Sequence, residues 1–119
     1  MKTVLCLAVL LPLAASQLMG GWSDMPLDDP KVTEYMAKVE KVYNQQNNDV
    51  SHHRALKATK AQQQVVSGVN YKIEYEFGRT DCKKGTVCAA DAPVTNKHTV
   101  KSKIYSQPWT NTEEITLQP

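Results

Sequence analysis

The spacing of hydrophobic positions changes once along the chain and divides it into a helical part and a strand part. Between Met25 and Asp49 apolar residues recur every three or four positions, as on one face of an α-helix: Val32, Tyr35, Met36, Val39, Val42 and Tyr43. Asp28 or Asp29 can cap the start of this helix, Pro30 falls in its first turn, and the polar run 44–49 ends it. One interpretation of the apolar stripe is a groove for a partner, but packing on a sheet explains it more simply.

Beyond residues 48–54, which the pattern predicts as a linker, the spacing becomes two. Residues 69–77 alternate strictly between apolar and polar, which is typical of a half-buried antiparallel strand. Residues 55–66 alternate poorly, and we predict a strand there mainly because the turn at Ser67-Gly68 needs a partner strand. Residues 98–106 and 113–118 predict two further strands around the loop 107–111. The sequence therefore predicts an α+β domain in which a helix lies across an antiparallel meander of four strands, or five with a short N-terminal strand.

Two of the predicted hairpin tips carry apolar residues where water should be the neighbour. Val65 and Val66 precede the turn at Ser67-Gly68, and Trp109 follows Pro108 in the loop between the last two strands. In a meander both tips lie at the same end of the sheet, whereas the segment around Asn48 lies at the opposite end. Each apolar residue could instead fold back over the end of its own sheet, but two such tips at one end favour a binding edge.

The N-terminal residues have the pattern of a secretory signal peptide. Lys2 is followed by an apolar run over residues 3–11 that is too short to span a bilayer, and then by small residues. We expect residues 1–16 to be removed between Ser16 and Gln17, which leaves a mature domain of residues 17–119. Because no second long apolar run follows, we expect the mature protein to be secreted and extracellular, with no membrane segment.

Cysteines and charge limit the chemistry that remains. Cys6 leaves with the signal peptide, so Cys82 and Cys88 are expected to form a disulfide outside the cell; two free thiols are the alternative. The three histidines are scattered without a metal-ligand spacing, so we predict no metal and no cofactor. The net charge of +2 comes without a basic block, which argues against a nucleic-acid partner. With no free Cys nucleophile and no His/carboxylate set, the chain is not expected to be an enzyme.

At the two tips the sequence resembles the cystatins, the reversible inhibitors of papain-like cysteine proteases. The run QVVSG matches the family's Q-x-V-x-G loop at Gln64, Val66 and Gly68, and PW at Pro108-Trp109 matches the second-hairpin dipeptide. LMGG at 18–21, GVNYKIEYEFGRTDC at 68–82 and HRAL at 53–56 are similar to the secreted, type 2 branch, so the likeness covers essentially the whole mature chain.

The resemblance implies a cystatin-like fold and a protease-binding wedge. It implies competitive, non-covalent inhibition of papain-like proteases such as cathepsins, with no catalysis by the chain itself. The wedge would consist of Leu18, Met19, Gly20, Gln64, Val65, Val66, Ser67, Gly68, Pro108 and Trp109. Leu18 and Met19 would occupy substrate subsites, and Gly20 would avoid the region of the catalytic cysteine. The rival interpretation is a non-inhibitory, secreted binding or structural protein with the same fold.

The resemblance also raises three further expectations. Residues 47–49 (Asn-Asn-Asp) fall where many type 2 members carry Ser-Asn-Asp, so Asn48 would be presented to legumain; alternatively the run is only a polar helix terminator. Type 2 members usually have two disulfides, and this chain has cysteines for the first alone, with Val100 near the expected third cysteine. We expect a monomer, with a domain-swapped dimer as the alternative that the resemblance implies.

Overall fold

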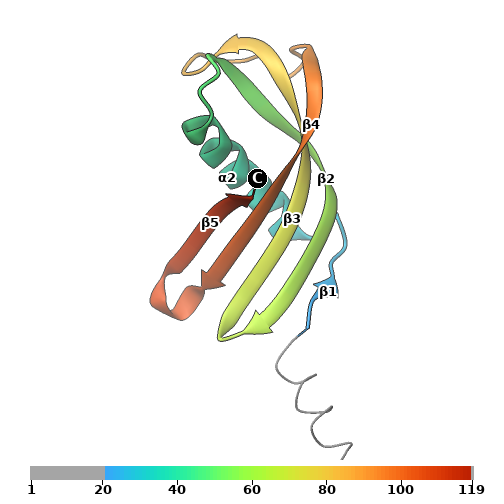
Figure 1. The fold of residues 1–119 in the computed structure, drawn as a ribbon, viewed down its shortest axis with the longest axis vertical. Helices are drawn as coiled ribbons and strands as arrows, with labels where there is room; N and C mark the ends of the chain where they lie inside the picture. The colour runs from blue at the N-terminus through green and yellow to red at the C-terminus, as the bar shows by residue number, and fades with distance from the viewer. Residues whose placement is uncertain (1–20, 119) are drawn as a thin grey trace, which may run out of the picture.

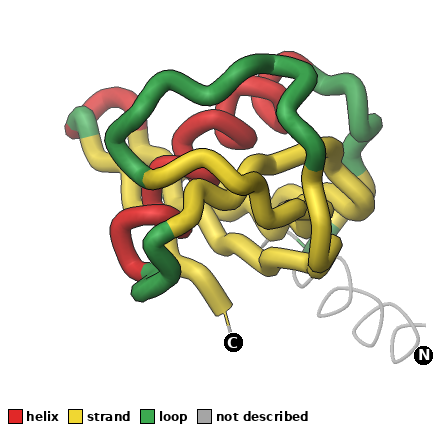
Figure 2. Tube along the Cα trace, turned by 90° about the horizontal axis from the view of Figure 1, so that it is seen from above, coloured by secondary structure: helices red, strands yellow, loops and turns green. Residues whose placement is uncertain are grey.

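A single antiparallel sheet curls around one helix in the computed structural model, which describes residues 21–118. The elements in chain order are β1 (Ser23–Asp24), α2 (Pro30–Gln46), β2 (Ser51–Val66), β3 (Gly68–Lys83), β4 (Val94–Gln107), the 3-10 helix η1 (Pro108–Thr110) and β5 (Thr112–Gln118). The strands pair in sequence order, β1-β2-β3-β4-β5, and each pairing is antiparallel. The predicted α+β meander is therefore confirmed, in its five-stranded form (Figures 1 and 2).

Helix α2 begins and ends where the sequence pattern predicts. Asp29 is its N-cap, and the Asp29 carboxylate accepts a hydrogen bond of 2.9 Å from the backbone N–H of Lys31. Pro30 occupies the first helical position, where the missing N–H would have no intrahelical partner. The helix ends at Gln46, within the polar run.

The apolar stripe of α2 packs on the concave face of the sheet, as the simpler interpretation predicted. Buried side chains of the helix and of the strands form one core: Met25, Val32, Tyr35, Val39, Ala55, Ala61, Tyr71, Ile73, Tyr75, Phe77, Val100 and Ile104. Tyr75 is fully buried, and its hydroxyl donates a hydrogen bond of 2.7 Å to the backbone oxygen of Val32. Burial raises the pKa of Tyr75, so this hydroxyl keeps its proton and remains a donor.

The pairing of β2 with β3 contains three register shifts, and the second and third explain the poor alternation of β2. These two fall directly after Ala55 and directly after Ala58, and each adds one residue to β2 relative to β3. Consequently the residues that pack on the core, Ala55, Ala58 and Ala61, are three positions apart instead of two. A spacing of three is not a strand signal, although the segment is one continuous strand.

The predicted linker over 48–54 is wrong in its second half, because β2 already begins at Ser51. Ser51 and His53 point into the protein, and each is only 7% exposed. Both side chains are polar, so a search for alternating apolar residues does not detect that this segment is the start of a strand. Side chains of α2 satisfy the free edge here: the Asn44 amide bonds both the N–H and the C=O of His53, and Glu40 accepts from the N–H of Ala55.

The meander separates two ends of the molecule. The β2–β3 and β4–β5 tips and the start of the described chain lie together at the lower end in Figure 1, and the α2–β2 and β3–β4 connections lie at the upper end. No helix among residues 21–118 is long and apolar enough to cross a membrane. The predicted signal peptide, residues 1–16, lies outside the described residues.

Candidate functional site

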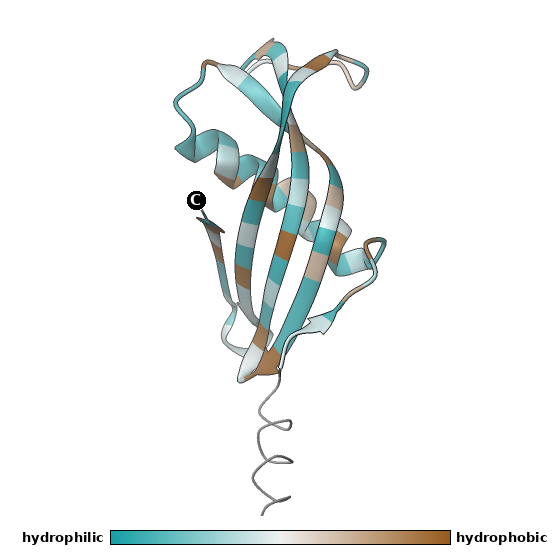
Figure 3. Cartoon of the chain, turned by 45° about the vertical axis from the view of Figure 1, so that its right-hand side comes forward, coloured by the Kyte–Doolittle hydropathy of each residue, from teal (hydrophilic) through white to brown (hydrophobic). Residues whose placement is uncertain are grey.

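The tip of the β2–β3 hairpin leaves both of its valines uncovered. Val65 pairs with Val69 and Val66 with Gly68, so Ser67 alone makes the turn. Val65 is 61% exposed and Val66 is 41% exposed. The hypothesis that these side chains fold back beneath the sheet is therefore wrong, and Figure 3 shows the hydrophobic colour reaching the lower end of this hairpin.

Gly68 is required at this tip for two independent reasons. Its φ of +104° lies where residues with a side chain are strained. A Cβ on Gly68 would also lie 2.6 Å from the backbone oxygen of Ser106, which is closer than real contacts allow. The glycine thus lets the first tip turn tightly while it packs against the end of β4.

The second tip is a short helical turn that holds Trp109 in solvent. Residues 108–110 form η1, and Asn111 closes the turn in the left-handed region with a φ of 54°. The Thr110 hydroxyl donates to the Gln107 side chain at 2.8 Å, which fixes the turn locally. Trp109 is 68% exposed. The prediction that both apolar tips are uncovered at one end of the sheet is confirmed.

Two residues that the sequence analysis did not single out join the tips to each other. The Tyr105 hydroxyl donates to the backbone oxygen of Ser67, and the Gln107 side-chain amide lies 3.2 Å from the Ser67 hydroxyl. Tyr105 follows the buried Ile104, so its ring is on the opposite face of β4 from the core. The sequence does contain a signal for Tyr105: it is an aromatic residue at a position of the strand that faces away from the core, where a polar residue is expected. These bonds hold the two tips as one surface before any partner arrives.

The start of the described chain is attached beside the first tip. β1 pairs with β2 at Gln62 and Gln63, only a few residues before Val65. The Trp22 ring lies over the Lys72 ammonium, 4.1 Å from ring centre to nitrogen. The predicted contact residues Leu18, Met19 and Gly20 lie outside the described residues, and Gln64 receives a 3.2 Å hydrogen bond from the Asn70 amide.

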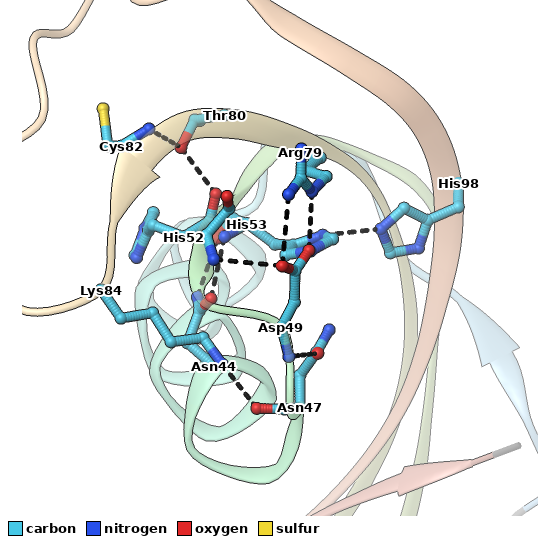
Figure 4. A network of polar contacts seen from close by, with 11 residues as sticks. Asn44, Asn47, Asp49, His52, His53, Arg79, Thr80, Cys82, Lys84 and His98 are labelled. Atoms are coloured by element: carbon cyan, nitrogen blue, oxygen red, sulfur yellow. Dashed lines mark hydrogen bonds and ion pairs between the residues drawn. The ribbon is translucent and has the colours of Figure 1, made fainter.

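At the opposite end of the sheet the loop 47–49 is held by an ordered polar network (Figure 4). The Asn47 side chain accepts a 2.7 Å bond from the N–H of Asp49, and Lys84 donates to the backbone oxygen of Asn47. Asp49 in turn binds the Arg79 guanidinium at 2.7 Å. Between these two fixed neighbours, Asn48 is exposed.

Asp49 is held in its ionised form by its neighbours. The Arg79 guanidinium, then the His53 ring and the N–H of Ser51, hydrogen-bond the Asp49 carboxylate and lower its pKa far below the ordinary value. The His53 ring lies 2.9 Å from the same carboxylate, and its other nitrogen lies 3.2 Å from His98. The sequence analysis treated the histidines as scattered; this is wrong for His53 and His98, because the sheet brings them into contact.

Cys82 and Cys88 form the predicted disulfide in the same region. Cys82 lies within β3 and Cys88 in the connection to β4. The Arg54 guanidinium donates to the backbone oxygens of Ala89 and Ala90 and thereby fastens this connection to β2. Within residues 21–118 no group of three or more His, Cys, Asp or Glu side chains could hold a metal ion.

Comparison with known proteins agrees with this architecture. The family model described as "Cystatin domain" matches residues 20–116. L-cystatin of Tachypleus tridentatus is 33% identical over 116 residues, covering 92% of this chain and 87% of that protein. Cystatin-C of Oryctolagus cuniculus is 35% identical over 101 residues, covering 80% of this chain and 68% of that protein.

A solved structure titled "Crystal structure of Al-CPI" superposes with a TM-score of 0.77 at 30% identity, and the match covers 84% of this chain and 96% of that one. The fold, the two uncovered tips, the family model and these relatives lead to one conclusion: the chain belongs to the cystatin family.

Proposed function

We propose that the protein is a secreted, reversible inhibitor that blocks papain-like cysteine proteases, such as cathepsins, by placing its two hairpin tips in the active-site cleft. Cystatins are generally inhibitors of cysteine proteases. The observation that carries the proposal is the joint exposure of Val65, Val66 and Trp109 at one end of the sheet. Apolar side chains at such tips gain free energy when a partner removes them from water.

The preformed geometry of the tips supports tight binding. Because Ser67 is bonded to Tyr105 and Gln107, the two tips do not need to be ordered during association, which lowers the entropic cost of binding. A protease–inhibitor interface of ordinary size, about 1,600 Å², can reach nanomolar affinity or tighter when it is preorganised. The tips occupy the cleft with side chains and turns and present no peptide bond in register for attack, so inhibition is competitive and non-covalent.

The N-terminal segment is the third part of the proposed wedge. Leu18 and Met19 fill substrate subsites, and Gly20 passes the catalytic cysteine without a side chain. Pairing of β1 with β2 brings the chain to the first tip at Gly21, which supports this role. A protein that starts at Gly20 is expected to bind cathepsins more weakly than one that starts at Gln17, chiefly through faster dissociation. Equal dissociation rates would refute the role of Leu18 and Met19.

Titration of papain with the mature protein tests the proposal against its rival. A known concentration of active papain is incubated with increasing amounts of residues 17–119, and the remaining peptidase activity is measured. Loss of activity that reaches completion near one inhibitor per enzyme is expected. Full activity at micromolar inhibitor would instead support a non-inhibitory binding protein with the cystatin fold.

A second site is proposed for legumain at Asn48, because a specific geometry favours it. Asn48 is exposed, while Asn47 and Asp49 on either side are fixed by hydrogen bonds, and such a preformed loop suits a protease that cleaves after asparagine. This loop and the wedge lie at opposite ends of the sheet, so both enzymes can bind at once. Asn48→Lys is expected to abolish legumain inhibition and leave papain inhibition unchanged; legumain inhibition equal to that of the natural sequence would contradict this site.

A further inference from the structure

The contact between His53 and His98 joins two strands that are not neighbours in the sheet. His53 lies on β2 and His98 on β4, and β3 runs between them. Nδ1 of His53 and Nε2 of His98 are 3.2 Å apart, and the Tyr43 ring of α2 packs against both imidazoles. Phe77 of β3 lies beneath this group, 5.0 Å from the Tyr43 ring. The pair therefore packs against the aromatic residues of the core, and Figure 4 shows the contact between the two imidazoles.

Hydrogen-bond accounting limits how many protons this pair can hold. The ionised Asp49 carboxylate can only accept, so Nε2 of His53 must donate to it over 2.9 Å. The gap between the two rings then has room for one hydrogen, donated either by Nδ1 of His53 or by Nε2 of His98. If both rings are protonated, two N–H groups point at each other and two like charges meet. The contact is compatible with at most one positive charge.

The surrounding charges do not relieve this conflict. Asp49, on the loop after α2, faces His53 and is shared with the Arg79 guanidinium of β3. Tyr43 is the titratable group that α2 presents to the pair, and Glu40 of α2 binds His52 instead, at 3.0 Å. In the described part of the chain no carboxylate makes an ion pair with His98, so a charge on that ring lacks a counter-ion.

We propose that the His53–His98 pair is an acid-operated latch, which is closed at neutral pH and opens when the second ring is protonated. Opening removes the β2–β4 contact and frees His98 with the adjoining part of β4, whereas a protonated His53 stays paired with the Asp49 carboxylate. The wedge stays intact, because Val66 is 13 residues along β2 from His53, about 40 Å at strand spacing. The protein thus has one end that responds to acid and one that does not.

The direction of the pH dependence follows from proton linkage. Burial, together with the charge of His53, lowers the pKa of His98 below its ordinary value. The unfolded or locally opened chain therefore binds more protons than the closed one in this range, so the closed form loses stability as pH falls below about 6.5, the ordinary histidine value. Above that pH the His53–His98 contact contributes its full free energy to the stability of the closed form.

Amide hydrogen exchange of the complete mature protein at pH 7.5 and pH 5, corrected for intrinsic rates, tests the latch. Residues 94–100, which include His98, are expected to open about tenfold more often at pH 5, whereas residues 62–70 keep their protection. In His98→Gln, whose amide can still bond His53 but cannot take a proton, this increase should disappear. His52→Gln is the matched control, because His52 pairs with Glu40 outside the latch, and it should retain the increase.

Histidine NMR titration of the natural sequence supplies a test that needs no variant to fold. Coupled rings give two separated protonation steps, each visible on both imidazoles, and the second step should coincide with the loss of exchange protection. Independent titration of His53 and His98 near pH 6.5, or equal exchange at both pH values, would overturn the proposal. So would an acid response that survives in His98→Gln.

Discussion

Replacement of Trp109 by alanine should separate binding from folding more cleanly than any other change at the tips. The side chain stands on η1 in solvent and belongs to no buried cluster of the described residues. Trp109→Ala should therefore leave the free energy of unfolding unchanged to within about 0.5 kcal/mol, as for other exposed positions. The same change should strongly weaken protease inhibition, because the exposed indole is surface that the cleft would cover.

The size of the binding loss can be worked from the exposure of the indole. Trp109 is 68% exposed, which for a residue that buries up to about 250 Å² leaves about 160 to 170 Å² for the protease to cover. At about 25 cal/mol per Å² this corresponds to roughly 4 kcal/mol, an upper bound that agrees with hot-spot values of about 2 to 4 kcal/mol. The inhibition constant should rise by about 30- to 1,000-fold.

The assay is progress-curve inhibition of papain, combined with chemical unfolding of the same preparations. Val87→Ala is the matched control, since Val87 is also an uncovered apolar residue, 101% exposed, but lies in the β3–β4 connection at the other end. It should change neither inhibition nor stability. An inhibition constant for Trp109→Ala within about threefold of the natural one, or an equal effect of Val87→Ala, would refute the reasoning.

Three further substitutions test separate parts of the account. Gly68→Ala should cost at least about 1 kcal/mol of unfolding free energy and weaken papain inhibition, because it strains a positive φ and drives a Cβ into β4. Tyr75→Phe should cost about 1 kcal/mol in urea unfolding by removing the buried bond to Val32 while inhibition stays unchanged. Trp22→Ala removes the ring that stacks on Lys72 and should speed dissociation from papain roughly two- to fivefold.

Each of these has an outcome that would count against it. A Gly68→Ala protein of natural stability would mean that the first tip can relax around a side chain. Reduced inhibition by a fully folded Tyr75→Phe protein would mean that the core and the tips are coupled. The Trp22→Ala effect should vanish in a protein that begins at Gly21; persistence there would mean that the ring acts on the sheet itself and not on the segment before it.

The sequence predicts the helix and the first part of β3 well because residues 32–43 and residues 69–77 each keep one hydrophobic period, whereas the alternation of β3 breaks at Gly78, where its pairing with β4 shifts register. The stripe from Val32 to Tyr43 and the alternation over 69–77 both correspond to faces of a single core. β2 is different, because the register shifts after Ala55 and after Ala58 place the inward alanines three positions apart. That irregularity is defined by the pairing of β2 with β3, so the sequence of β2 alone does not reveal it.

The candidate site likewise has features that the sequence reveals and contacts that it does not. Exposed valines and a tryptophan at predicted turns are visible in the sequence because each conflicts with its local surroundings. The bonds from Tyr105 and Gln107 to Ser67 are not visible, since they join residues about 40 positions apart through the sheet. The His53–His98 contact cannot be predicted from the sequence for the same reason: the two residues are 45 positions apart and belong to strands that do not pair.

The location of the protease on the inhibitor tests the central claim most directly. Hydrogen exchange of the mature protein, alone and in complex with papain, would report which backbone segments the enzyme covers. The account predicts slower exchange at residues 64–68 and 107–111, with exchange at 84–93 unchanged. Protection confined to 84–93, or a complex that leaves both hairpin tips as they are in the free protein, would contradict it.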